Sequence, residues 1–477
     1  MTEEGSNGRS RSPRPVLGGR LRRAATPTRL IARGAGAAAM ARARALRGDT
    51  AADIAFDPRL VAVAEEIARS LGEMKGAAMK IGQALSFVDV SLIPEEYRKA
   101  LSILQSEAPA MPYKQVEKVI HAELGDSPEK VFTWFSPKPI AAASIGQVHM
   151  AHLDDRELVV KVQYPGVAKA VEADLRNAAL LSTLARVGQK MLVGLVGDVD
   201  VTALIDEVRD RVGEELDYRI EAANQQEFAD LFRGDPDIGV PEIVPELSTR
   251  RVLTSEYVDA MRWGAALEQP QEQRDKWGRA IARFVYTSLY RHGVVNVDTH
   301  PGNYLFHEDG TVTFLDFGCV ARFTPSQLER VRGVLLAILA NDETAILDAL
   351  VAMGMLRSRD GFNPETLLEP LRRSLQPVHA PQPFRYSREM MAEVIAESLK
   401  LRVGMDELRL MQKFDCPREY VLLGRTSIGL ESVLAYLEAS LDLPSLFEEV
   451  LGEAISLGPS PAAAREDEAP AIATSSE

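Results

Sequence analysis

The feature that most constrains this chain is a set of polar residues on two short stretches in the second half of the sequence. Asp298 and Asn303 lie five positions apart, and Asp316 begins the triplet Asp-Phe-Gly a short interval later. Magnesium prefers hard oxygen ligands, commonly one or two protein side chains together with phosphate oxygens. Asn303 and Asp316 suit that purpose, while Asp298 stays available as a base that orients a nucleophile. The spacing therefore predicts two neighbouring loops that carry phosphoryl-transfer chemistry.

The catalytic loop of protein kinases has the same spacing, with an Asp as base and an Asn as metal ligand ahead of Asp-Phe-Gly. Each part is weak evidence alone. Asp-Phe-Gly occurs by chance, and His300-Pro-Gly-Asn303 is also a common kind of turn. The combination, in this order, favours a nucleotide site.

A single lysine lies in an apolar stretch upstream. Residues 158–166 are predicted to form a buried strand in which Lys161 is surrounded by valines. A buried Lys is costly unless it is paired, and in kinases such a Lys binds the nucleotide phosphates and a helical Glu. The alternative is a Lys on an edge strand whose amine reaches water.

Small side chains precede that strand where kinases have a glycine-rich loop. Small residues allow backbone N–H groups to approach phosphate oxygens, although alanines restrict the loop more than glycines do. We therefore expect nucleotide-binding residues in a loop made of Ala141, Ala142, Ala143 and Ser144.

An acidic helical stretch follows, within a region expected to be helical from about residue 166 to 233. Asp217 and Glu221 are predicted to share one helix face, with Glu215 about a third of a turn away from Glu221, so these acids can serve different partners. A solvated acidic helix would show the same pattern. The long interval from Lys161 implies an inserted helical segment.

Further strands and helices surround these motifs. The backbone near Glu256 and Val258, at the end of a predicted strand, is expected to receive an adenine edge as a hinge between two lobes would. No long activation segment follows Gly318, which counts against a platform for protein substrates. Strands are predicted at 131–135, 240–244 and 251–258, and helices at 112–124, 271–292, 325–339, 390–410 and 419–437.

The N-terminal third contains one long amphipathic helix. Apolar residues recur at helical spacing over residues 60–85, and a second stripe contains Gly72, Gly76, Lys80 and Gln83. Glycines weaken a helix by about 1 kcal/mol each, so they indicate close approach of another element, into which Lys80 and Gln83 would point. The alternative is an exposed Lys and Gln beside incidental glycines.

Charge and composition exclude several classes of protein. Residues 1–50 contain eleven Arg, no Lys and three acids, a net charge of +8. Because the whole chain carries −14, the rest of the chain carries −22. An acidic body is not expected to bind nucleic acid. Two cysteines are too few for a disulfide framework, and no apolar run is long enough to span a membrane. We expect a cytoplasmic protein, without a secretory signal, and disordered ends.

The basic segment 20–47 leaves two interpretations open. Its Arg residues alternate with apolar ones, as in a helix that lies on anionic lipid headgroups. A solvated tail rich in Arg and Ala would look similar.

Together these motifs resemble the UbiB (ABC/ADCK) family of atypical kinases. The resemblance covers about residues 57–445. Its motifs, in chain order, are Lys80-Ile-Gly-Gln83, the Ala-rich stretch with Ile145-Gly-Gln-Val-His149, Lys161, Glu215-Leu-Asp217 with Glu221, Asp298–Asn303 and Asp316-Phe-Gly318.

This resemblance implies an α+β, bilobal protein-kinase-like fold with a small β-rich N-lobe, a helical C-lobe and an N-terminal helical K-x-G-Q extension that occludes the protein-substrate site. It implies binding of ATP or ADP with Mg²⁺, and support of ubiquinone or other prenyl-lipid biosynthesis at membranes, with lipids and lipid-biosynthesis enzymes as partners. Lys161 would bind phosphates and pair with Glu221, while Lys80 and Gln83 would face the nucleotide with Glu215 as their partner.

Two departures from the family pattern matter. Asn296 replaces the His of the usual catalytic triplet, and the C-terminal transmembrane segments of several bacterial members have no counterpart here. The expected divisions are a basic segment 1–50, the extension 51–125, the N-lobe with a helical insertion 126–258, the C-lobe 259–457 and an acidic tail 458–477.

Three hypotheses follow. The first is an ATPase or atypical kinase that couples nucleotide turnover to lipid handling, with water as one candidate acceptor. The second is an ordinary small-molecule or protein phosphotransferase, which the missing activation segment disfavours. The third is a nucleotide-binding scaffold without catalysis, which the retained acids and amide disfavour.

Overall fold

The structure is a computed structural model, and it describes residues 110–143, 145–167, 216–357, 368, 375–391, 393 and 417–452. Several predictions lie outside these residues. They are the two ends expected to be disordered, the basic segment 20–47, the helix at 60–85 with Lys80 and Gln83, the residues Ser144 and Glu215, residues 168–215 of the helical region expected at 166–233, and most of the helix expected at 390–410.

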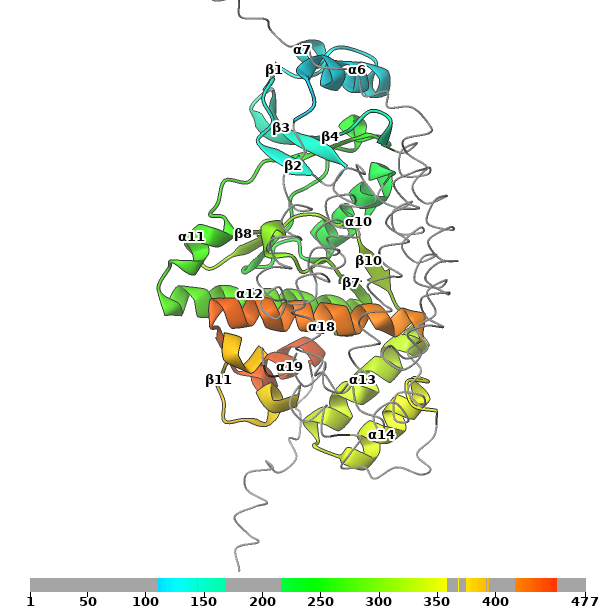
Figure 1. Cartoon of the computed structure of the whole chain (residues 1–477), viewed down its shortest axis with the longest axis vertical. Coiled ribbons are helices and arrows are strands. Elements are labelled where there is room, and N and C mark those ends of the chain that lie inside the picture. Colours follow the sequence, from blue (N-terminus) through cyan, green and yellow to red (C-terminus); the bar gives the residue numbers. More distant parts are fainter. Residues whose placement is uncertain are drawn as a thin grey trace, which may run out of the picture.

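The N-terminal lobe is built on an antiparallel sheet with strand order β1-β3-β4-β6, in which β2 also pairs with β3 (Figure 1). The strands are β1 (Trp134–Phe135), β2 (Ala141–Ala143), β3 (Gly146–Leu153), β4 (Arg156–Gln163) and β6 (Val252–Glu256). Side chains alternate across β4, so that Leu158, Val160 and Val162 are buried on one face and Lys161 lies on the other. The alternation of side chains along β4 thus places Lys161 on the face opposite these buried residues.

Two short helices cover the apolar face of this sheet. Helix α6 (Tyr113–Leu124) contributes Val116, Val119 and Ile120 to the hydrophobic cluster that contains the buried valines of β4. Helix α7 (Pro128–Val131) follows it directly. The strand expected at 131–135 is therefore wrong in its first part, because Pro128 in the first helical turn favours a helix up to Val131.

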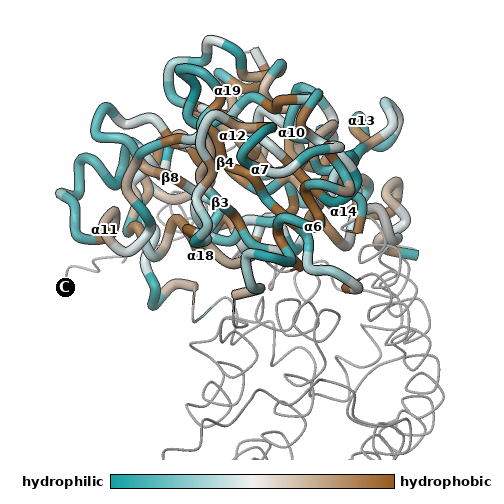
Figure 2. The backbone as a smooth tube through the Cα atoms, turned by 90° about the horizontal axis from the view of Figure 1, so that it is seen from above, coloured by the Kyte–Doolittle hydropathy of each residue, from teal (hydrophilic) through white to brown (hydrophobic). Residues whose placement is uncertain are grey.

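The second lobe is helical and surrounds α12, with α18 beside it (Figure 1). Figure 2 shows hydrophobic stretches gathered around β4 and α12, and hydrophilic segments around α11. The helices of this lobe are α11 (Trp263–Leu267), α12 (Gln271–His292), α13 (Pro325–Leu339), α14 (Glu343–Ala352), α18 (Arg418–Leu437) and α19 (Leu443–Leu451). Helix α10 (Tyr218–Leu231) contacts β6 of the N-terminal sheet, and Phe228 and Phe232 at its C-terminal end pack against Phe284 of α12.

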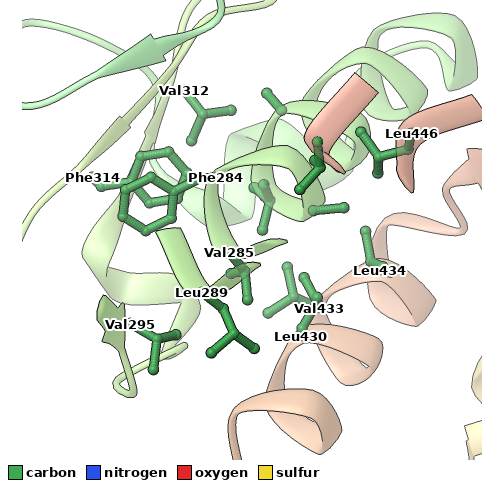
Figure 3. Close-up of a cluster of buried hydrophobic side chains, with 14 of the residues drawn as sticks. Phe284, Val285, Leu289, Val295, Val312, Phe314, Leu430, Val433, Leu434 and Leu446 are labelled. Atoms are coloured by element: carbon green, nitrogen blue, oxygen red, sulfur yellow. The ribbon is translucent and has the colours of Figure 1, made fainter. Parts of the chain in front are cut away.

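The core of this lobe joins α12 to both the small strands and α18 (Figure 3). Phe284 of α12 stacks on Phe314 with ring centroids 3.7 Å apart, and Leu430, Val433 and Leu434 of α18 belong to the same buried cluster. The helices predicted at 271–292, 325–339 and 419–437 are present, with Thr324 forming a capping box at the start of α13.

Short strands flank the loops that contain Asp298, Asn303 and Asp316. They are β5 (Ile238–Gly239), β7 (Val294–Asn296), β8 (Tyr304–Phe306), β9 (Val312–Phe314), β10 (Val320–Arg322), β11 (Phe384–Arg385) and β12 (Ser440–Leu441), with single turns of 3₁₀ helix at η1 (Pro245–Leu247) and η2 (Pro301–Asn303). Strand β10 pairs with β7, and β9 lies between β5 and β8.

The strand predicted at 240–244 is wrong. The chain forms β5 just before it, and Ile243 makes a single bridge to Ser255. Glu242 and Val244 each make one backbone hydrogen bond to β6, but Pro241 has no N–H to donate, which limits the pairing to this short stretch.

The predicted two-lobed α+β arrangement is present in the part of the chain that the structure describes. Within the same residues, no helix combines the length and the apolar character needed to cross a bilayer.

Candidate active site

The centre of the site is the side chain of Lys161. Its Nζ donates hydrogen bonds of 2.8 and 2.9 Å to the two carboxylate oxygens of Glu221 and lies 3.7 Å from Oδ2 of Asp316. Lys161 comes from β4, Glu221 from the first turn of α10 and Asp316 from the loop after β9. The predicted pair of Lys161 and Glu221 is thus present, and it joins three elements.

The carboxylates of Glu221 and Asp316 affect the protonation of Lys161. Burial alone would lower the pKa of Lys161, but the carboxylates of Asp316 and Glu221 outweigh that effect and raise the pKa well above its usual range. Lys161 therefore carries a fixed positive charge at neutral pH. A permanent cation on this face of the sheet suits an anionic ligand.

The start of α10 places Glu221. Asp217 is the N-cap residue, and its side chain accepts a hydrogen bond from the backbone N–H of Arg219 at 3.1 Å. The sequence prediction that Asp217 and Glu221 share one helix face is therefore wrong, because a capping Asp lies outside the helical turns and its carboxylate turns back to their N–H groups. Asp217 fixes where the helix begins.

Asn296 links the loop that carries Asp298 to the loop that carries Asp316. Its Nδ2 donates to the backbone carbonyl of Asp316 at 3.0 Å, and its Oδ1 accepts from the backbone N–H of Asp298 at 3.1 Å. The side chain is buried. Sequence reasoning treated Asn296 as a departure from the pattern and did not predict this linking role.

The loop that carries Asp298 rests on α18. Thr299 is buried, and a Cβ atom placed on Gly429 of α18 would lie 1.9 Å from Oγ1 of Thr299. Glycine at position 429 therefore permits a contact that any side chain would prevent. No local pattern pointed to Thr299 or Gly429, since they are far apart in the sequence.

Asp316 has an unusual backbone. Its φ is +33°, in the left-handed region that residues other than glycine rarely adopt. The Oδ1 atom of Asp316 accepts from the N–H of Gly318 at 3.1 Å. The next residue, Phe317, is fully buried against Phe228, and the carbonyl of Phe317 accepts from Nδ2 of Asn224 at 2.9 Å. These contacts on both sides hold the carboxylate of Asp316 in place despite the strained backbone.

The predicted metal ligands, Asn303 and Asp316, lie on segments that are joined by a backbone hydrogen bond. Asn303 ends η2, and its carbonyl accepts from the N–H of Leu315, so it lies beside the residue that precedes Asp316. Among the described residues, no three His, Cys, Asp or Glu side chains form a metal cluster. An amide and a carboxylate match an ion whose remaining ligands are phosphate and water oxygens.

The predicted Ala-rich loop is a strand in the structure. Ala141, Ala142 and Ala143 form β2 and pair with β3, and the hairpin turn lies between Ala143 and Gly146. The prediction of a loop over these alanines is wrong, because the sheet edge of β3 offers them regular pairing. The alanines still lie at the end of the sheet near Lys161, since Ala141 pairs with Val148 and Val148 with Lys161.

The predicted hinge follows β6. Glu256 ends that strand, and Tyr257 donates its backbone N–H to the carbonyl of Glu157. The backbone N–H of Val258 makes no hydrogen bond to another described residue.

Comparison with known proteins gives a consistent picture. The family model described as the ABC1 atypical kinase-like domain matches residues 103–350. The chain is 30% identical over 390 residues to the chloroplastic Protein ACTIVITY OF BC1 COMPLEX KINASE 8 of Arabidopsis thaliana, covering 77% of this chain and 51% of that protein. It is 33% identical to the mitochondrial atypical kinase COQ8B of Rattus norvegicus, over 71% of this chain and 65% of the relative. The chain thus spans between half and two thirds of these relatives.

A solved structure shares the fold as well. The structure of Rv3197 from Mycobacterium tuberculosis, determined as a complex with erythromycin, matches with a TM-score of 0.58 and 30% sequence identity, covering 81% of this chain and 95% of that one. The family model covers more than half of the chain, in agreement with the kinase-like order of the site residues. The chain belongs to the ABC1 atypical kinase-like family.

Proposed function

We propose that this protein binds a magnesium nucleotide and catalyses ATP-dependent phosphoryl transfer, with water as one acceptor. The observation that carries the proposal is the position of Lys161, whose ammonium lies between Glu221 and Asp316. This arrangement offers a cation for phosphate oxygens beside a carboxylate for the metal. It requires three elements that are far apart in sequence to meet at one point.

Each predicted residue has a defined task in this proposal. Lys161 contacts the phosphates, and Glu221 holds it in place. The backbone at Ala141–Ala143 and Ser144 lies over the phosphates, and the backbone of Glu256 and Val258 receives the adenine. Lys80 and Gln83, with Glu215 as their partner, are proposed to face the nucleotide from the extension.

The reaction follows from these positions. Asn303 and Asp316 would hold Mg²⁺, which neutralises charge on the phosphate oxygens during transfer. Asp298 orients the attacking hydroxyl or water by accepting its proton at a carboxylate oxygen. Asn296 holds the backbone of Asp298 and the carbonyl of Asp316 together, so base and metal ligand keep one relative position.

The biological setting is also a proposal. Family membership and the COQ8B relative support a role in isoprenoid-quinone or other prenyl-lipid biosynthesis. Such a role would bring the protein to a membrane surface, and residues 20–47 are the proposed contact with anionic lipid. The domain divisions drawn from the sequence belong to the same proposal.

The test is ATP hydrolysis by the full chain, with and without anionic liposomes and prenylated phenols. Wild type, Asp316→Asn and the matched control Asp309→Asn are compared. Asp309 is an exposed residue of the β8–β9 turn whose oxygen accepts the N–H of Thr311, which an Asn can also do.

We expect hydrolysis by wild type and Asp309→Asn, and loss of at least about tenfold in Asp316→Asn, since even residues behind the metal ligands contribute that much. Equal rates for all three proteins would reject catalysis at this site. Nucleotide binding without turnover would instead support a scaffold, and phosphate on an added phenol or peptide would support a phosphotransferase.

A further inference from the structure

Tyr218 lies beside the proposed phosphate-binding groups, although the sequence analysis gave it no role. It is the first residue of α10 and is 1% exposed. Its backbone N–H donates to the carbonyl of Arg250 at 3.0 Å. Its ring belongs to a small buried cluster that includes Ile145, Leu216 and Leu253. The position of this side chain is therefore fixed by both backbone and packing.

The ring of Tyr218 faces the ammonium of Lys161. Nζ lies 5.0 Å from the ring centroid, within the range in which the negative face of an aromatic ring attracts a cation. The same ammonium is bonded to Glu221 and lies near Asp316. Tyr218 is thus a third group that orients Lys161.

The hydroxyl of Tyr218 reaches the β2–β3 hairpin. A Cβ atom placed on Gly146 would lie 2.8 Å from the Tyr218 hydroxyl oxygen and 2.4 Å from the carbonyl oxygen of Val162. Gly146 is the first residue of β3 and pairs with Ala143 across the turn. The tyrosine therefore contacts the hairpin at the point where only a glycine fits.

These two contacts have one consequence for an anionic ligand. A carboxylate that holds Lys161 also repels phosphate, whereas an aromatic ring attracts the ammonium without adding a full negative charge. The ring can therefore fix the direction of the ammonium without weakening its attraction for phosphate. The hydroxyl, at the other end of the same rigid side chain, contacts the hairpin whose backbone is proposed to lie over the phosphates.

Building on the proposed nucleotide site, we propose that Tyr218 is a positioning residue that holds Lys161 and the β2–β3 hairpin in one relative position. Both phosphate-binding groups then depend on a single rigid side chain. A tyrosine that merely fills space would affect stability but would not distinguish a nucleotide from a nucleoside.

The first experiment compares the Kd of ATP with that of adenosine, using wild type, Tyr218→Leu and Tyr218→Phe. Loss of the ring in Tyr218→Leu should weaken ATP binding by about tenfold, within the range of a buried cation–π contact, and adenosine binding by less than about twofold. Tyr218→Phe keeps the ring but lacks the hydroxyl that reaches the hairpin, so its Kd for ATP should lie between those of Tyr218→Leu and wild type.

The control is Tyr386→Leu, the same change at a tyrosine that is also 1% exposed but belongs to the core of the second lobe. It should leave the ratio of the two Kd values unchanged. Equal weakening of ATP and adenosine by Tyr218→Leu, or the same change of ratio in the control, would overturn the proposal.

The second experiment needs no nucleotide. A double-mutant cycle of Tyr218→Leu and Lys161→Met, measured by urea unfolding, should show a coupling of about threefold to thirtyfold in the unfolding equilibrium constant. Additive effects, within about twofold, would show that the ring does not hold Lys161. If wild type binds no nucleotide, the proposed function falls, and this cycle still decides the contact between Tyr218 and Lys161.

Discussion

The side-chain amide of Asn296 donates to the backbone carbonyl of Asp316 at 3.0 Å and accepts from the backbone N–H of Asp298 at 3.1 Å. One buried side chain therefore couples the proposed base to the proposed metal ligand. Both hydrogen-bonding functions of the amide are used.

Replacing Asn296 should separate the roles of these two bonds. Asn296→Leu loses both and leaves a backbone carbonyl and N–H without their partner, so we expect kcat to fall by about tenfold or more and the unfolding midpoint to drop. Asn296→Asp can still accept from Asp298 but cannot donate to Asp316, and its rate should also fall. Steady-state kinetics and thermal unfolding measure both effects, and a wild-type kcat in Asn296→Leu would contradict the linking role.

Gly429→Ala should displace the loop that carries Asp298. The added Cβ would lie 1.9 Å from Oγ1 of Thr299, so α18 and the loop must separate. We expect a lower unfolding midpoint and a lower rate of ATP hydrolysis. The second change Thr299→Ala should restore part of both, because it removes the oxygen that collides.

Gly424→Ala is the matched control on the same helix. Nothing lies within 4 Å of a Cβ atom at that position, and it is exposed. Alanine should stabilise the helix there by up to about 1 kcal/mol. If both alanine variants behave alike in hydrolysis and unfolding, the contact between Gly429 and Thr299 has no bearing on the site.

Magnesium dependence should identify the metal ligands. Removal of Mg²⁺ with EDTA is expected to abolish hydrolysis. Asn303→Ala should raise the Mg²⁺ concentration for half-maximal rate by at least about tenfold, since even residues behind the ligands contribute that much in metal sites. Asp309→Asn should leave the titration unchanged. An unaltered magnesium titration in Asn303→Ala would remove Asn303 from the site.

Glu431 gives a pH dependence of stability that is independent of the site chemistry. Burial raises the pKa of this α18 carboxyl from 4.5 to about 7. The folded state therefore binds its proton more tightly than the unfolded state does, and the stability that this provides is lost as the pH rises from about 4.5 to 7.

Glu431→Gln removes this titration. The variant should match wild type in its pH trend below pH 4.5 and become relatively more stable as the pH rises to 7 and above. Unfolding midpoints measured across this range, with the exposed Glu448→Gln as control, test the prediction. A constant difference between Glu431→Gln and wild type at every pH would contradict it.

Local patterns were sufficient for much of the fold. The helix at 271–292, the buried strand around Lys161 and the helix that starts after Thr324 were predicted correctly, because periodicity and capping act within a few residues of the chain. The predictions for Asp217 and for the strand at 240–244 failed where a single capping side chain or a proline decided the outcome.

The sequence by itself determined which residues are candidates for the site, since the spacing of Asp298, Asn303 and Asp316 and the lysine in an apolar strand are local properties. Tertiary structure alone decided how these groups meet. Asn296 reaches Asp316 across twenty positions, and Gly429 meets Thr299 through the packing of α18 on the loop. Such contacts depend on the close packing of distant elements, which no short stretch of sequence specifies.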